Sequence, residues 1–142
     1  MEALAAIAAT PTIKQPNLFI QCALLHDSIE DTETTFADIE HEFGPEVASG
    51  VLALTKNKNL ASKKEQMVDS IRRIQDQPIE IWMVKLCDRI TNLQPPPKHW
   101  DTVKISKYRD EASIILNQLG EANHFLADRL LFKIDSYSKY IK

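Results

Sequence analysis

The stretch from residue 79 to residue 93 limits most strongly how this chain can fold, because as a helix it is apolar on most sides. A surface helix keeps a polar face, so neighbouring elements must cover this one. We therefore predict a central, buried helix around which the rest of the chain packs. The apolar residues of this stretch are Ile79, Ile81, Trp82, Val84, Leu86 and Ile90.

The rest of the chain also has helical spacing. Its β-branched residues are scattered, and it contains no Asn-Gly or Asp-Gly hairpin turn. We predict an all-α fold, a helical bundle of about six to eight helices. Start and stop signals place the first helices at residues 2–9 and from Pro16 onward. The next helix runs from Thr35, with Asp38 completing a capping box, to Gly44, and another begins at Pro45. Further helices are predicted from Ser62 to before Pro78 and, after the Pro95–Pro97 connector, at 101–118 and 121–140.

Size and composition exclude several classes of protein. The 142 residues suit one domain, so we expect a single domain over residues 1–142. A net charge of −3 argues against a nucleic-acid binder, and no apolar run reaches the ~18–20 residues of a membrane span. Cys22 and Cys87 lie in apolar stretches without metal-site spacing. We expect them to be buried free thiols of a cytoplasmic protein.

Four ionisable residues follow the apolar end of the second predicted helix, namely His26, Asp27, Glu30 and Asp31. Unpaired buried charges are costly, so this group requires a compensating partner. Imidazole and carboxylate ligands together suit a divalent transition metal. His26 and Asp27 project about 100° apart on a helix, so both reach one metal only at a helix end or bend. The alternative is a set of solvated helix-end charges with His26 as a cap.

A second polar group lies in the most apolar helix. Asp88 requires a partner there, and Asn92 lies one turn further along the same face. We expect Lys85 and Arg89 to point to other faces of this helix. An anionic ligand would need local cations, and the candidates are Lys85, Arg89, Lys104 and Lys107, each of which is otherwise an ordinary solvated side chain.

The two motifs together resemble the HD superfamily of metal-dependent phosphohydrolases. Leu24-Leu25-His26-Asp27 precedes Glu30-Asp31-Thr32, and Asp88 follows Asp27 by 61 residues. The Glu-Asp-Thr extension and the Asp-x-x-x-Asn pair are similar to the RelA/SpoT-type guanosine polyphosphate (ppGpp) 3′-pyrophosphohydrolases, including small stand-alone members. The resemblance covers about residues 18–125.

This resemblance implies an HD fold that holds one Mn²⁺, or another divalent transition metal, and releases pyrophosphate from the 3′ position of ppGpp to leave GDP. It implies metal binding by His26, Asp27 and Asp88. It implies that Glu30 and Asp31 orient and deprotonate the attacking water. It implies substrate binding by Asn92, with Lys85, Arg89 and Tyr108 as further substrate-binding candidates.

The chain departs from the family at its start, where a further metal-binding histidine is expected and residues 1–25 contain none. We expect the chain to be incomplete at the N-terminus. The alternatives are a member impaired in hydrolysis that binds a partner or nucleotide, or another residue as ligand. The other histidines are expected at the surface or in a loop, and they are His41, His99 and His124.

Missing N-terminal helices would uncover apolar residues and favour a homo-oligomer. The residues that would be exposed are Leu4, Ile7, Phe19 and Leu24. We expect Trp82 and Trp100 to pack in the core and against a loop, and Tyr137 and Tyr140 to anchor the last helix at the surface. A hydrolase of another nucleotide or phosphate ester on the same site is the alternative reading of the function.

Overall fold

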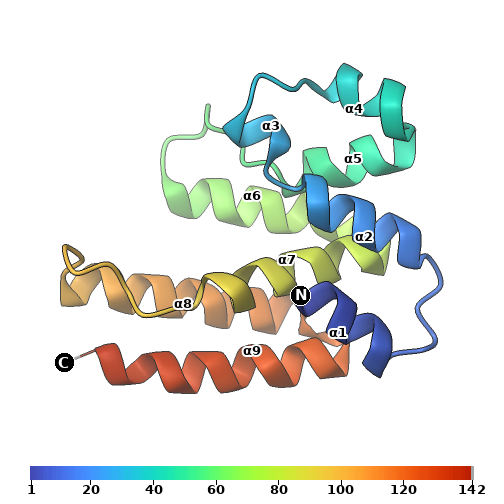
Figure 1. Cartoon of the computed structure of the whole chain (residues 1–142). Helices are drawn as coiled ribbons and strands as arrows, with labels where there is room; N and C mark the ends of the chain where they lie inside the picture. Colours follow the sequence, from blue (N-terminus) through green and yellow to red (C-terminus); the bar gives the residue numbers. More distant parts are fainter. Residues whose placement is uncertain (142) are drawn as a thin grey trace.

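Helix α7 (Ile79–Asn92) runs through the middle of the molecule (Figure 1). The computed structural model describes residues 1–141. Six other helices of at least eight residues contact α7, and nine of its fourteen residues are buried. Its two ends reach the surface, where Ile79 is 51% exposed and Thr91 and Asn92 are also exposed. The predicted central helix is therefore confirmed.

The described residues form helices and no strands, which confirms the all-α prediction. Eight helices are at least eight residues long, and α3 is a single turn. Besides α7 they are α1 (Glu2–Ala9), α2 (Pro16–Leu25), α3 (Ser28–Asp31), α4 (Phe36–Phe43), α5 (Pro45–Leu54), α6 (Lys63–Gln75), α8 (Thr102–Leu119) and α9 (His124–Tyr137), with 3-10 turns at Gly120–Ala122 and Ser138–Tyr140. No helix among residues 1–141 is long and apolar enough to cross a membrane.

The helix boundaries follow the predicted local signals. The Thr35 side chain accepts a hydrogen bond from the Asp38 backbone N–H, and the Asp38 side chain accepts one from the Thr35 N–H. Gly44 then separates α4 from α5 with φ 93°, a left-handed conformation that favours glycine. Helix α6 starts at Ser62, as predicted, and the Ser62 side chain accepts a hydrogen bond from the Glu65 backbone N–H.

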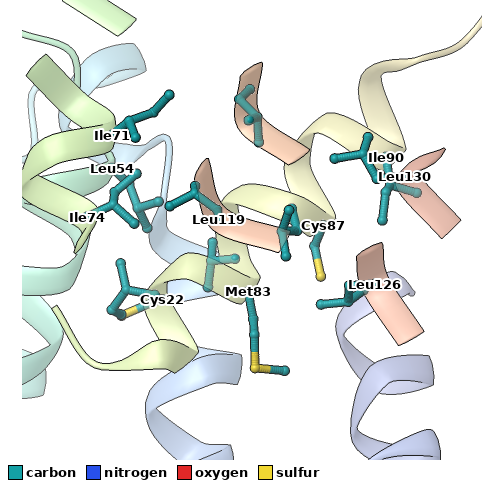
Figure 2. Packing of buried hydrophobic residues seen from close by; sticks show 14 of the residues in the cluster. Cys22, Leu54, Ile71, Ile74, Met83, Cys87, Ile90, Leu119, Leu126 and Leu130 are labelled. Atoms are coloured by element: carbon teal, nitrogen blue, oxygen red, sulfur yellow. The ribbon is translucent and has the colours of Figure 1, made fainter. Parts of the chain in front are cut away.

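The core lies on both sides of α7, between α4 and α5 on one side and α1 and α9 on the other (Figure 1). Figure 2 shows Leu54 and Ile74 packed on one side of the cluster, and Leu126 on the other. Cys22 and Cys87 are both buried and unpaired, as predicted.

Two details differ from the sequence predictions. Tyr137 is only 2% exposed because it packs between the rings of Tyr108 and Tyr140, so its predicted surface position is wrong. Phe19 is fully buried, since α2 turns this side chain toward the core. Leu4 and Leu24 are exposed as expected, by 59% and 79%.

Candidate active site

A bend between α2 and α3 turns two adjacent side chains toward one point. Helix α2 ends at Leu25, and Asp27 has φ −96° and ψ −1° before α3 begins at Ser28. The Ser28 hydroxyl donates to the Leu25 carbonyl over 2.7 Å and stabilises the turn. This bend is the geometry that two adjacent ligands require.

His26, Asp27 and Asp88 converge at this bend. The His26 Nε2 atom lies 3.1 Å from Asp27 Oδ2 and 3.1 Å from Asp88 Oδ1, although Asp88 belongs to the distant helix α7. One ligand atom from each residue lies within 4.8 Å of the other two. An ion about 2 Å from each atom would fit between ligands with this spacing.

The hydrogen bonds of His26 constrain its protonation. Its Nδ1 lies 2.7 Å from the Ala23 carbonyl, which accepts only, so Nδ1 carries a proton. Nε2 then faces two carboxylates and requires either a second proton or a metal. The hydrogen bond with Asp88 raises the pKa of His26 to about 9, against the effect of burial. Burial also raises the pKa of Asp27, opposed by His26. The donor set therefore fits a divalent metal, with the imidazole oriented through its other nitrogen.

Asp88 has further partners on its own helix. Asn92 Nδ2 donates to Asp88 Oδ1 over 3.0 Å, as the spacing of four residues predicted. Lys85 Nζ lies 3.8 Å from Asp88 Oδ2, so the prediction that Lys85 points to another face is wrong. Its long side chain is buried and turns back toward the carboxylate. Burial would raise the pKa of Asp88, but the hydrogen bond with His26 and the charge of Lys85 outweigh it and lower the pKa.

The structure separates the two predicted catalytic carboxylates. Glu30 lines a cavity of about 210 Å³, which His26, Asp27 and Asp88 also line. Its Oε1 accepts a hydrogen bond of 2.8 Å from the Lys56 backbone N–H. Asp31 is exposed and does not line this cavity.

A larger groove of about 720 Å³ continues from the cavity, and Glu30, Lys85 and Tyr108 line both. The groove is rich in cations and has three carboxylates along it, Glu30, Asp101 and Glu111. Three of its lysines were missed by the sequence analysis, because they belong to the polar segment after α5 and the start of α6. The cations are Lys56, Lys58, Lys63, Lys85, Arg89, Lys104 and Lys107.

Aromatic rings form part of the groove. The Arg89 guanidinium lies 4.3 Å from the centre of the Tyr108 ring, and Nη1 donates to the Tyr108 carbonyl over 3.3 Å. Its Nε is buried without a hydrogen-bond partner among residues 1–141. Trp100 meets Tyr108 of α8 edge-on, with ring centres 5.3 Å apart, and also lines the groove.

The other histidines do not join the cluster. All three are exposed, as expected, and lie in α4, in the proline-rich connector and at the start of α9. They are His41, His99 and His124.

Comparisons with known proteins identify a family and several similar proteins. The HD domain family matches residues 3–123. The guanosine-3′,5′-bis(diphosphate) 3′-pyrophosphohydrolase MESH1 of Danio rerio is 34% identical over 117 residues, which are 78% of this chain and 63% of that protein. The Homo sapiens protein of the same name is 31% identical over 120 residues, 80% of this chain and 66% of that protein. This chain thus spans slightly less than two thirds of these relatives.

Two solved structures have similar folds. One, described as a metazoan ortholog of SpoT that hydrolyzes ppGpp, matches with a TM-score of 0.73 and 26% identity, over 97% of this chain and 76% of that chain. The other is a crystal structure from Listeria monocytogenes EGD-e, with a TM-score of 0.73 and 23% identity over 96% of this chain and 92% of that chain. The second likeness concerns the fold alone.

Proposed function

Because this chain belongs to the HD domain family, we propose that it is a metal-dependent phosphohydrolase that releases pyrophosphate from the 3′ position of ppGpp. The observation that carries the proposal is the convergence of His26, Asp27 and Asp88 beside Glu30 at one end of a cationic groove. The two curated relatives and the SpoT ortholog, whose names give this reaction or substrate, support it.

His26, Asp27 and Asp88 would hold the metal. One imidazole and two carboxylates favour Mn²⁺ or a similar divalent transition metal over Ca²⁺. When bound, such an ion lowers the pKa of water and neutralises phosphate charge. The chain itself fixes the donors: the Ala23 carbonyl orients His26, and Asn92 and Lys85 hold the Asp88 carboxylate.

Glu30 is the proposed general base. It lines the same cavity as the three ligand residues, and the Lys56 N–H holds one of its oxygens while the other stays available for a proton. Asp31 follows it on the same one-turn helix, and we assign Asp31 a supporting role from the rim.

The groove is the proposed substrate site. A guanosine polyphosphate carries several negative charges, and lysines together with Arg89 would neutralise them next to the cavity. Asn92 lies at the cavity itself, where its amide can contact the nucleotide. The Tyr108 ring, backed by Arg89, offers a surface near the base. This local charge explains how a chain with a net charge of −3 binds a polyanion.

A second candidate is a catalytically impaired chain that binds nucleotide. This candidate is favoured by the small number of possible metal ligands. The group contains three residues among those that the structure describes, whereas the family resemblance implies a further histidine. A hydrolase of another nucleotide or phosphate ester is compatible with the same groove.

Pyrophosphate release from ppGpp in excess Mn²⁺ tests these candidates. Wild-type protein, Asp88→Asn and the exposed control Asp128→Asn are compared, with nucleotide binding measured by calorimetry. The proposal expects release by wild type and the control and none by Asp88→Asn. Nucleotide binding without release supports the second candidate, and turnover of another nucleotide in place of ppGpp supports the other hydrolase. Neither binding nor release contradicts all three.

Two further proposals concern the state of the protein. The buried, unpaired Cys22 and Cys87 support a cytoplasmic location. The exposed Leu4 and Leu24 support a homo-oligomer, which sedimentation velocity would detect. A monomer at all concentrations would contradict the oligomer.

A further inference from the structure

We propose that Arg73 is a positioning residue that holds Glu30 in its working orientation through one peptide group, an inference that rests on the function proposed above. Arg73 belongs to α6 and does not line the cavity or the groove. It acts on the backbone at the end of α5.

The Arg73 guanidinium caps the C-terminus of α5. Its Nη1 donates to the Leu52 carbonyl over 2.7 Å, and its Nη2 donates to the Thr55 carbonyl over 2.7 Å. Its Nε donates to Asp69 Oδ2 over 3.0 Å, which fixes the plane of the guanidinium. The last carbonyls of a helix have no partner within the helix, and a cation is favourable there. The planar, three-sided arrangement requires an arginine.

The peptide group between Thr55 and Lys56 connects this cap to the active site. Its carbonyl accepts from Arg73, and its N–H donates to Glu30 Oε1 over 2.8 Å. A peptide group is planar, and in the trans form its C=O and N–H point in opposite directions. Fixing the carbonyl on the α6 side therefore fixes the direction of the N–H toward Glu30.

Glu30 depends on this contact for its orientation. Among residues 1–141, the Lys56 N–H is its one hydrogen-bond donor, and α3, which carries Glu30, is only four residues long. Without a fixed N–H the carboxylate would sample other rotamers, and a misplaced general base reacts slowly even when the substrate still binds.

The first test separates positioning from general damage. Arg73→Lys keeps the charge but cannot make all three hydrogen bonds, and Arg72→Gln is the control, because Arg72 is an exposed neighbour on the same helix. We expect Arg73→Lys to lower kcat by about ten- to hundredfold with little change in KM, and Arg72→Gln to leave both unchanged. In a Glu30→Gln background, Arg73→Lys should lower the residual kcat no further, because the residue it positions is already removed. An unchanged kcat, or an equal loss in the Glu30→Gln background, would overturn the proposal.

The second test does not depend on catalysis. Hydrogen exchange of the Lys56 amide, followed by NMR, should be slow in wild type and about tenfold faster in Arg73→Lys and in Glu30→Ala, with Arg72→Gln like wild type. If wild type releases no pyrophosphate from ppGpp, the proposed function fails, and this exchange still decides whether Arg73 holds the peptide group and Glu30. Equal exchange in wild type and Arg73→Lys refutes the positioning role.

Discussion

Gly50 lies where α5 approaches α2, which leads to His26, and α7, which carries Asp88. A Cβ atom built on it would lie 2.6 Å from Ile81 Cδ1 on α7 and 3.0 Å from Cys22 Sγ on α2. Both side chains are fully buried and have little space to move away. The perturbation Gly50→Ala therefore tests how tightly these three helices pack.

Two opposing effects decide whether Gly50→Ala stabilises or destabilises the protein. Alanine is favoured over glycine in a helix interior by about 1 kcal/mol, which would stabilise the variant. Overpacking a filled core costs about 1–3 kcal/mol, and a contact of 2.6 Å lies well inside van der Waals distance. We expect a net loss of about 1 kcal/mol in the free energy of unfolding, and a Tm lower by about 3 °C for a chain of this size.

Urea unfolding followed by circular dichroism would measure the loss, and Ile81→Val supplies the matched test. This substitution removes the clashing Cδ1 and by itself costs about 1 kcal/mol. In the double variant the clash is relieved, so the total loss should be smaller than the sum of the two single losses by about 1 kcal/mol. A Gly50→Ala variant more stable than wild type, or strictly additive losses, would refute the tight packing inferred here.

Three further predictions concern stability. Thr35→Ala removes the cap of α4 and should lower the free energy of unfolding by about 1 kcal/mol in urea titrations, whereas Thr35→Ser should be nearly neutral. Burial raises the pKa of Cys22 and Cys87 from 9.0 to about 12. The stabilisation of the folded protein by the two neutral thiols is therefore complete below pH 9 and is lost as pH rises toward 12. A Cys22→Ala/Cys87→Ala protein should accordingly lose stability less steeply above pH 9, by about 1.4 kcal/mol per pH unit for each thiol; equal slopes would contradict this. Arg129→Gln breaks the bidentate pair with Glu2, which is partly exposed, and should cost no more than about 1 kcal/mol by the same titration, so a larger loss would mean that the pair clamps α1 onto α9.

Local sequence signals predicted the helices well because the physical causes are local. The apolar circumference of 79–93, the capping box at Thr35 and the glycine at 44 each act within a few residues. The same holds for the Asp88–Asn92 hydrogen bond, which depends only on helical spacing. The assignment of the whole chain to one domain stays a prediction.

The parts of the site that the sequence did not reveal depend on tertiary contacts. Lys56 and Lys58 are ordinary residues of a polar segment until the fold places that segment opposite α8. Arg73 carries no sequence signal, because its partners are backbone carbonyls of another helix. Tyr137 was misplaced for the same reason, since its buried position comes from packing against Tyr108.

The cationic groove has a consequence for kinetics. The whole chain is acidic, with a net charge of −3, while seven of its 17 basic residues line this one groove. A polyanion would therefore be attracted to the groove more strongly than to the rest of the described surface, which would orient it before contact. Such steering would favour encounters at the groove, which adjoins the cavity beside Glu30. The charge distribution thus sorts approaching molecules by sign and direction before any hydrogen bond forms.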